Sequence, residues 1–242
     1  MNFKGKVISN VMLTSDVFQL IIKVNGKMDY QIGQFVNFYL PHKTLPRPIS
    51  IAGGDGEYLR FLIKIVGEGT KYLGRLRQGE EINLLGPLGR GFTLENTEDK
   101  KVAIVGGGIG IAPLLPLARI KFKEAKYYFG FNQSQFAIDD IGKKYPLTIT
   151  LDKNGENIVE AFAKDLERER FDFVYFCGPE IMLAKIQDLL VNKGIKGELS
   201  TEAKMACGVG GCLVCTCATV DGHKRVCKDG PVFSVGEVVF NG

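Results

Sequence analysis

The sequence predicts a multi-domain β plus α/β fold, with an antiparallel β-barrel over residues 1–97, a doubly wound parallel-sheet domain over 98–200 and a small cysteine-rich domain over 201–242. Three observations carry this prediction. Short apolar runs separated by turn formers fill the first part. Apolar strands alternate with helical patterns in the second part, and five of the chain's six cysteines fall within residues 205–227 of the third.

The barrel prediction rests on a series of short strand patterns: KVISNVML, VFQLIIKV, QFVNFYL, YLRFLIKIV and EINLLG. Turn-forming clusters such as NGKMD, PHKTLPRP and GGDGE break the series. In YLRFLIKIV, alternate residues from Leu59 to Ile65 share one face, which is typical of a half-buried antiparallel strand. A helix is expected at GTKYLGRL, with Thr70 as its N-cap.

The texture of the chain changes after the polar stretch ENTEDKK. The expected strands are KVAIVG, KYYFGF, LTITL and FDFVYFC, and the expected helices are IAPLLPLARIKF, NIVEAFAKDLERER and PEIMLAKIQDLLVNKG. Nearly continuous apolar strands joined by crossover helices predict a parallel sheet covered on both faces. Such a doubly wound unit typically binds a nucleotide outside the carboxyl ends of its strands.

The segment from about Thr201 onward is rich in glycine and cysteine and has room for two or three short strands around a turn at Asp221 and Gly222. About forty residues are too few to build a core of their own. We therefore expect a metal centre to hold this segment together.

Charge and composition argue against nucleic-acid or membrane partners. The formal net charge of +4 comes from 31 basic and 27 acidic residues spread along the chain, with no dense block of one sign. The start, MNFKGKVISNVML, carries polar residues where a signal peptide needs an apolar core. We therefore expect a cytoplasmic protein, in which clustered cysteines bind metal or react more often than they form disulfides.

Two glycine-containing turns are candidates for nucleotide binding in the second part. GGGIGIAP follows the strand KVAIV and opens an expected helix, so backbone N–H groups near Gly107, Gly108 and Gly110 can approach a pyrophosphate. The alternative is a tight turn that binds nothing. The polar NQSQ after KYYFGF leaves the choice between NAD and NADP open.

The second turn is Cys177-Gly178-Pro179, at the end of another expected strand. It can face the same crevice as Gly108. The alternative is that Cys177 is a small buried hydrophobe.

Two loops of the barrel are weaker candidates for binding a phosphate-containing ligand. In Arg47-Pro48-Ile49-Ser50 the guanidinium can hold a phosphate and the hydroxyl can bond a heterocycle. In Gly67-Glu68-Gly69-Thr70 backbone donors lie at a helix start. Each motif alone is also an ordinary loop element.

The cysteine spacing points to a redox-active metal centre. Cys207, Cys212 and Cys215 form C-x4-C-x2-C, and Cys227 follows after eleven more residues. This is the plant-type ferredoxin spacing for a 2Fe–2S cluster held by four thiolates. Structural zinc more often uses paired C-x2-C knuckles or histidine, and remains the alternative. Cys217 is the spare thiol, and spacing alone does not exclude it as a ligand.

The order of these motifs along the chain resembles the ferredoxin reductase family, and within it the electron-transfer subunits of class 1B, NAD-dependent dihydroorotate dehydrogenases. The resemblance implies that Cys207, Cys212, Cys215 and Cys227 hold a 2Fe–2S cluster. It implies that the nicotinamide nucleotide, a co-substrate, lies against Gly107, Gly108, Gly110, Cys177, Gly178 and Pro179. It implies that FAD contacts Arg47, Pro48, Ile49, Ser50, Ile63, Lys64, Ile65, Gly69 and Thr70.

The resemblance also implies a function in pyrimidine biosynthesis. A nicotinamide exchanges two electrons at once whereas a 2Fe–2S cluster accepts one, so a flavin is needed between them. The implied partner is the FMN-containing catalytic dihydroorotate dehydrogenase subunit, in a heterotetramer with two copies of each chain. Two alternatives stay open: an FAD and 2Fe–2S subunit of a sulfite reductase or hydrogenase that oxidises NAD(P)H, and a nucleotide-binding protein with a structural zinc module. The two histidines, His42 and His223, belong to no recognisable constellation.

Overall fold

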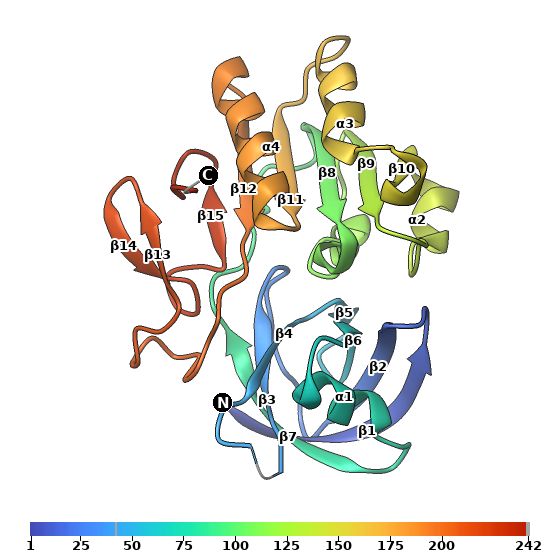
Figure 1. Ribbon diagram of the computed structural model, residues 1–242, viewed down its shortest axis with the longest axis vertical. Helices are drawn as coiled ribbons and strands as arrows, with labels where there is room; N and C mark the ends of the chain where they lie inside the picture. Colours follow the sequence, from blue (N-terminus) through green and yellow to red (C-terminus); the bar gives the residue numbers. More distant parts are fainter. Residues whose placement is uncertain (42, 241–242) are drawn as a thin grey trace.

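The computed structural model describes residues 1–41 and 43–240, which form two main sheets and a smaller hairpin beside them (Figure 1). The barrel-like sheet lies at one end of the molecule and the α/β sheet at the other. None of the helices within these residues is long and apolar enough to cross a membrane.

The first sheet is antiparallel and has the strand order β4-β3-β7-β1-β2-β6-β5. It curls so that β4, near one end, contacts β6, near the other. Its members are β1 (Asn2–Met12), β2 (Val17–Val24), β3 (Phe35–Tyr39), β4 (Arg47–Ser50), β5 (Gly53–Gly54), β6 (Tyr58–Lys64) and β7 (Glu81–Leu88).

Helix α1 (Glu68–Arg75) follows β6, but its N-cap is Gly67 and not Thr70. Thr70 lies within the first turn, where its hydroxyl accepts hydrogen bonds from the N–H groups of Val66 (2.9 Å) and Gly67 (3.2 Å). The predicted N-cap was therefore wrong by one turn, because the threonine hydroxyl bonds backward to the loop and does not begin the helix.

The second sheet has the order β10-β9-β8-β11-β12-β15, and its first five members pair in parallel. The strands are β8 (Lys101–Gly107), β9 (Glu124–Phe131), β10 (Leu147–Leu151), β11 (Phe173–Cys177), β12 (Lys196–Ser200) and β15 (Val232–Ser234). The helices are η1 (Gly108–Ile111), η2 (Leu115–Arg119), α2 (Asp139–Lys144), η3 (Asp152–Asn154), α3 (Ile158–Leu166) and α4 (Glu180–Lys193). The sequence patterns missed β12 and α2.

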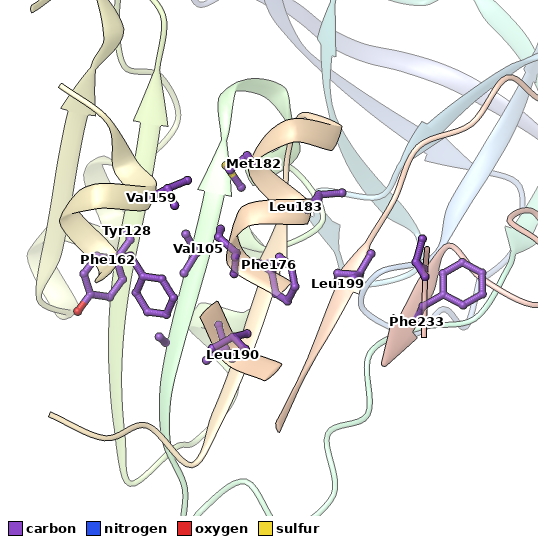
Figure 2. Packing of buried hydrophobic residues seen from close by; sticks show 14 of the residues in the cluster. Val105, Tyr128, Val159, Phe162, Phe176, Met182, Leu183, Leu190, Leu199 and Phe233 are labelled. Atoms are coloured by element: carbon purple, nitrogen blue, oxygen red, sulfur yellow. The ribbon is translucent and has the colours of Figure 1, made fainter. Parts of the chain in front are cut away.

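The two faces of this sheet carry separate layers, which is what makes it doubly wound. Val105 and Phe176 pack against α3 and α4, whereas Ile104 and Tyr175 pack against η1, η2 and α2. Figure 2 shows the first layer, in which Val105 and Phe176 lie among side chains of α3 and α4. Period-two alternation along each strand sends successive apolar residues to opposite layers.

The helix expected at IAPLLPLARIKF is wrong. The chain forms two short 3₁₀ turns there, η1 and η2, with bonds such as Leu114 N–H to Ile111 O and Leu117 N–H to Leu114 O. Pro113 and Pro116 lack the N–H groups that an α-helix would need at those positions. The strand-to-helix turn therefore has no α-helical N-terminus to supply partial positive charge.

The C-terminal segment forms the expected hairpin, β13 (Thr216–Thr219) and β14 (Gly222–Arg225), around the turn at Asp221. Its last strand, β15, leaves the hairpin and pairs antiparallel with β12 of the α/β sheet. Its buried side chains Cys215, Val226 and Phe233 join the same core layer as Leu199 of β12. Figure 2 shows Leu199 between Phe176 and Phe233.

A buried carboxylate joins the chain leaving the barrel to the α/β sheet. Glu198 on β12 has a side chain that is 4% exposed and pairs with Arg90 at 3.0 Å. It also accepts hydrogen bonds from the Thr93 N–H (2.7 Å) and hydroxyl (2.8 Å). Arg90 and Thr93 follow β7, so this network fixes where the barrel ends relative to β12.

Replacing Glu198 with alanine is expected to lower the free energy of unfolding by about 1–2 kcal/mol, because the change removes three hydrogen bonds to the carboxylate, whereas the donors on the exposed residues Arg90 and Thr93 can turn to water. Urea denaturation followed by circular dichroism measures this loss. Glu98→Ala removes the exposed partner of Lys121 and is the control, with an unchanged midpoint expected. Equal midpoints for wild type and Glu198→Ala would contradict the prediction.

Candidate functional site

A cavity of about 310 Å³ lies where the barrel, the turn after β8 and the start of the C-terminal segment meet. Its volume is in the range of small-molecule sites. Ile109, Ala112 and Pro113 line it from the α/β domain. Seven of the residues predicted to contact FAD line it from the barrel: Arg47, Pro48, Ile49, Ser50, Ile63, Lys64 and Thr70. Of the other two, Ile65 packs against the barrel core and Gly69 lies beneath Arg47.

The guanidinium of Arg47 lies across the first turn of α1. A Cβ atom at Gly69 would collide with Arg47 Nε, so only glycine allows this approach. Arg47 Nη1 donates to the carbonyl oxygens of Leu45 (2.8 Å) and Pro46 (3.2 Å), which orients the side chain. A fixed positive charge and the N-terminal N–H groups of a helix thus converge, and this combination suits a phosphate group.

The opposite wall of this cavity was missed by sequence reasoning. Thr201, Glu202, Ala203 and Met205 line it just beyond the end of β12. Solvent reaches the Glu202 side chain, but the surrounding protein raises the pKa of its carboxyl group by desolvation. No local pattern marks these residues, since they face the barrel only because β12 ends at the same edge as β8 and β11.

The two predicted nucleotide turns lie in van der Waals contact. A Cβ atom at Gly110 would lie 2.7 Å from the carbonyl oxygen of Cys177 and equally close to the backbone of Gly178. A Cβ atom at Gly107 would lie 2.9 Å from Pro179 Cδ. The glycines therefore let the loops after β8 and β11 pack backbone against backbone.

A second cavity, of about 240 Å³, opens beside these turns. Gly108 lines it together with Lys64, which also lines the first cavity, so the two cavities adjoin. Asn132, Gln133 and Ser134, which follow β9, line it as well. In the sequence this polar stretch has no acidic residue and no arginine, the residue types that would distinguish NAD from NADP, so it gave no choice between them.

The Cys177 thiol points into the core. It is 2% exposed and packs in the layer that contains Ile111 and Tyr175. Burial, together with the nearby Glu202, raises the pKa of the Cys177 thiol, which keeps it neutral. At this turn Gly178 is half-buried and Pro179 exposed, so these residues are more accessible than the thiol.

The four predicted cluster cysteines form two pairs. Cys207 neighbours Cys212, and Cys215 neighbours Cys227, closely enough for each pair's thiols to shift the pKa of one member. Within residues 1–41 and 43–240, no three His, Cys, Asp or Glu side chains converge on a point that would hold a single ion. A 2Fe–2S cluster is held by two thiolates on each iron, so paired cysteines match its demand.

Backbone N–H groups are directed at the sulfurs of both pairs. Val209 N donates to Cys207 Sγ and Cys227 N donates to Cys215 Sγ, each at 3.4 Å. Hydrogen bonds from Val209 and Cys212 lower the pKa of Cys207 to about 6, which favours the thiolate that binds metal. Burial and the neighbouring Cys215 raise the pKa of Cys227 to about 12, so its thiolate needs a metal cation beside it.

Cys217 belongs to neither pair, although Cys215 is near enough to help burial raise the pKa of its thiol. It is on β13 opposite Lys224 and packs, half-buried, against the core of the α/β domain. Of the histidines, His223 lies in the hairpin opposite Ala218, and His42 lies outside the described residues.

Two family models match the chain. Residues 4–92 match the oxidoreductase FAD-binding domain. Residues 202–239 match the iron–sulfur cluster binding domain of dihydroorotate dehydrogenase B. The second match favours the iron–sulfur interpretation of the cysteines over the zinc interpretation.

The chain is also similar to full-length relatives. It is 39% identical over 98% of its length, and 96% of the relative's, to the electron transfer subunit of dihydroorotate dehydrogenase B (NAD(+)) of Clostridium acetobutylicum. The corresponding subunit of Clostridium perfringens is 38% identical, with 98% of each chain covered. The chain belongs to this family of electron transfer subunits. Its fold class and its FAD and iron–sulfur domains are those the sequence predicted.

Solved structures place this electron transfer subunit in a wider group. An NADH-dependent reduced ferredoxin–NADP oxidoreductase superposes with a TM-score of 0.84 at 28% identity, covering 98% of this chain and 90% of that one. The ferredoxin reductase of carbazole 1,9a-dioxygenase superposes with a TM-score of 0.69 at 22% identity, covering 81% and 66%. The second likeness concerns the fold alone.

Gly110→Ala in this electron transfer subunit is expected to raise the KM for NADH on the order of tenfold, as a shift of about 1.4 kcal/mol in binding would. The added methyl meets backbone atoms of Cys177 and Gly178, so the two turns must separate. NADH-driven dye reduction by the FAD-loaded protein measures this KM. Gly142→Ala is the control, because its methyl makes only an ordinary contact with Leu147; an unchanged KM for Gly110→Ala would contradict the prediction.

Proposed function

We propose that this chain carries electrons between the catalytic dihydroorotate dehydrogenase subunit and NAD in pyrimidine biosynthesis. Physiological flow runs from the partner to NAD. The partner carries its own FMN, oxidises dihydroorotate to orotate and assembles with this chain as a cytoplasmic heterotetramer. The family membership supports the reaction, since the Clostridium relatives carry the name of this subunit.

The observation that carries the proposal is the convergence of three candidate sites. Lys64 borders both cavities, and Phe35 borders the first cavity while packing in the same core layer as Cys215 and Cys227. A nucleotide, a flavin and a cluster held at these places would lie in this order, with the first cavity in the middle. Such an order is what electron transfer through three centres requires.

We assign the first cavity to FAD. Arg47 and the start of α1, at Gly69 and Thr70, hold its phosphates. Pro48, Ile49 and Ser50 of β4 and Ile63, Lys64 and Ile65 of β6 and its following loop border its ring system. Burial of these apolar side chains keeps water from the reacting edge, and FAD supplies the conversion between two-electron and one-electron transfer when it is bound.

We assign the second cavity to the nicotinamide nucleotide. Of the six predicted residues Gly108 lines it, Gly107 and Gly110 lie on either side of Gly108, and Cys177, Gly178 and Pro179 form the turn that packs against Gly107 and Gly110. The domain boundaries near residues 97 and 200 belong to the same proposal, supported by the change of sheet at β8 and by the end of β12.

We assign Cys207, Cys212, Cys215 and Cys227 to the 2Fe–2S cluster. Cys215 and Cys227 are 2% exposed and lie on the inner side, whereas Cys212 is exposed beside Leu213 and Val214, which are 63% and 56% exposed. The outer pair, Cys207 and Cys212, therefore offers the exposed Cys212 to a partner while Cys207 bonds to Asn37 of the barrel, and the inner pair, Cys215 and Cys227, lies in the core.

The decisive experiment is co-purification with the catalytic subunit, followed by assay of NAD-dependent orotate formation by the pair. Activity that needs both chains supports the proposal. A pair that forms no orotate with NAD, while the catalytic subunit alone oxidises dihydroorotate with a dye, contradicts it. Visible absorption with flavin and broad iron–sulfur bands distinguishes the proposed protein from a zinc module.

Cys212→Ser is expected to keep FAD and NADH-driven dye reduction but to lose electron transfer to the partner, because an iron loses one of its thiolates. Stopped-flow absorbance of the partner's flavin measures that transfer. Cys217→Ser is the matched control and should leave the cluster spectrum intact. Partner reduction at the wild-type rate in Cys212→Ser would overturn the assigned path.

A further inference from the structure

The side chain of Asn37 is a buried amide on the outer face of the barrel. Its strand neighbours Val36 and Phe38 point into the barrel core, so Phe35 and Asn37 point outward. Asn37 is nevertheless 0% exposed, because the cysteine-rich segment covers it. An amide in this position has been removed from water by a contact between two parts of the chain.

This amide contacts the first turn of the cysteine loop. Asn37 Nδ2 donates to the carbonyl oxygen of Cys207 at 3.3 Å. Gly208, with φ +73°, packs so closely on the same amide that a Cβ atom would collide with Nδ2. The loop therefore rests on Asn37 at the first predicted cluster ligand and at its neighbour.

The other half of the amide is unsatisfied. Asn37 Oδ1 is buried and has no hydrogen-bond partner among the described residues. A buried oxygen without a partner destabilises a fold, and an apolar side chain of the same shape would avoid that cost. A role for the Nδ2 donor would explain an amide at this position.

The position of Asn37 suggests that role. It pairs with Pro48, and Phe35 pairs with Ser50, so β3 lies directly beside the strand that lines the first cavity. The outer face of β3 thus separates that cavity from the cysteine loop. A change in the position of Cys207 against β3 therefore changes the distance between the first cavity and the cysteine loop.

We propose that Asn37 is a positioning residue that fixes the cluster loop against the flavin-binding barrel and so sets the coupling between the two redox sites. The inference rests on the proposed function. Its hydrogen bond fixes the outer cysteine pair through Cys207, while the inner pair is fixed by burial. Arg225 holds the same loop from the hairpin side, through Nη1 to Gly210 O at 3.3 Å and its ion pair with Asp229. Loss of the Asn37 bond therefore loosens the loop on one side without unfolding it.

Asn37→Leu tests the proposal, because leucine keeps the branched shape and removes both the donor and the orphan oxygen. The variant is expected to keep its FAD, cluster content and melting temperature. Its reduced cluster should give a broadened EPR signal and lose iron faster to a chelator. Cluster reduction after mixing with NADH, followed by stopped-flow absorbance, should slow several-fold while dye reduction stays normal.

Asn37→Asp separates the hydrogen bond from packing. Aspartate has nearly the same size, but its ionised carboxylate places an acceptor against the Cys207 carbonyl, so cluster reduction, measured above the pH at which this buried carboxyl ionises, should slow at least as much as in Asn37→Leu. Asn10→Ala is the matched control: this amide also bonds backbone carbonyls, those of Leu73 and Leu76 at 2.9 Å, within the barrel and away from the cluster. It should leave the EPR signal unchanged.

Wild-type EPR signals, chelation rates and cluster-reduction rates in both Asn37 variants overturn the positioning role. A normal rate in Asn37→Asp with a slow rate in Asn37→Leu also overturns it, since packing alone would then be responsible. Failure of NADH to reduce the cluster in the wild-type protein would instead contradict the proposed function.

Discussion

The C-terminal segment has no hydrophobic core of its own. The positions of the cysteine pairs and of the first cavity depend on the core into which this segment packs. Phe233, Val226, Cys215 and Cys227 bury themselves in the layer that already packs α3 and α4 on the α/β sheet. Phe35 of the barrel joins that same layer. Shared burial therefore holds three parts of the chain together, and it places the cysteine pairs beside the cavity between the barrel and the sheet.

Close backbone approach is the second constraint, and glycine meets it in each part. Gly69 allows Arg47 to lie over α1, Gly110 allows two sheet loops to touch, and Gly208 allows the cysteine loop to rest on Asn37. At each place a side chain would force atoms apart at a candidate cofactor or contact site. The glycines thus control distances between sites more than they confer flexibility.

Hydrogen bonds between polar groups fix the contacts between parts of the chain that apolar packing alone would leave loosely defined. Glu198 binds Arg90 and Thr93 between the end of the barrel and β12, and Asn37 binds Cys207 between the barrel and the cysteine loop. Hydrogen bonds are directional where hydrophobic contact is not. Electron transfer through successive centres depends on fixed separations, so such joints suit the proposed function.

The sequence by itself determined the order of the sheets, most of the strands in both and the spacing of the four cysteines, because these depend on periodicity and local spacing. The helix predicted at IAPLLPLARIKF was wrong, although Pro113 and Pro116 argue against an α-helix there. The N-cap of α1 was also wrongly predicted at Thr70. Only the tertiary structure decided that Glu202 and Met205 line the first cavity and that Asn37 bonds to Cys207. Those contacts join residues far apart in the chain, and the local sequence around one residue does not indicate which distant residue it will contact.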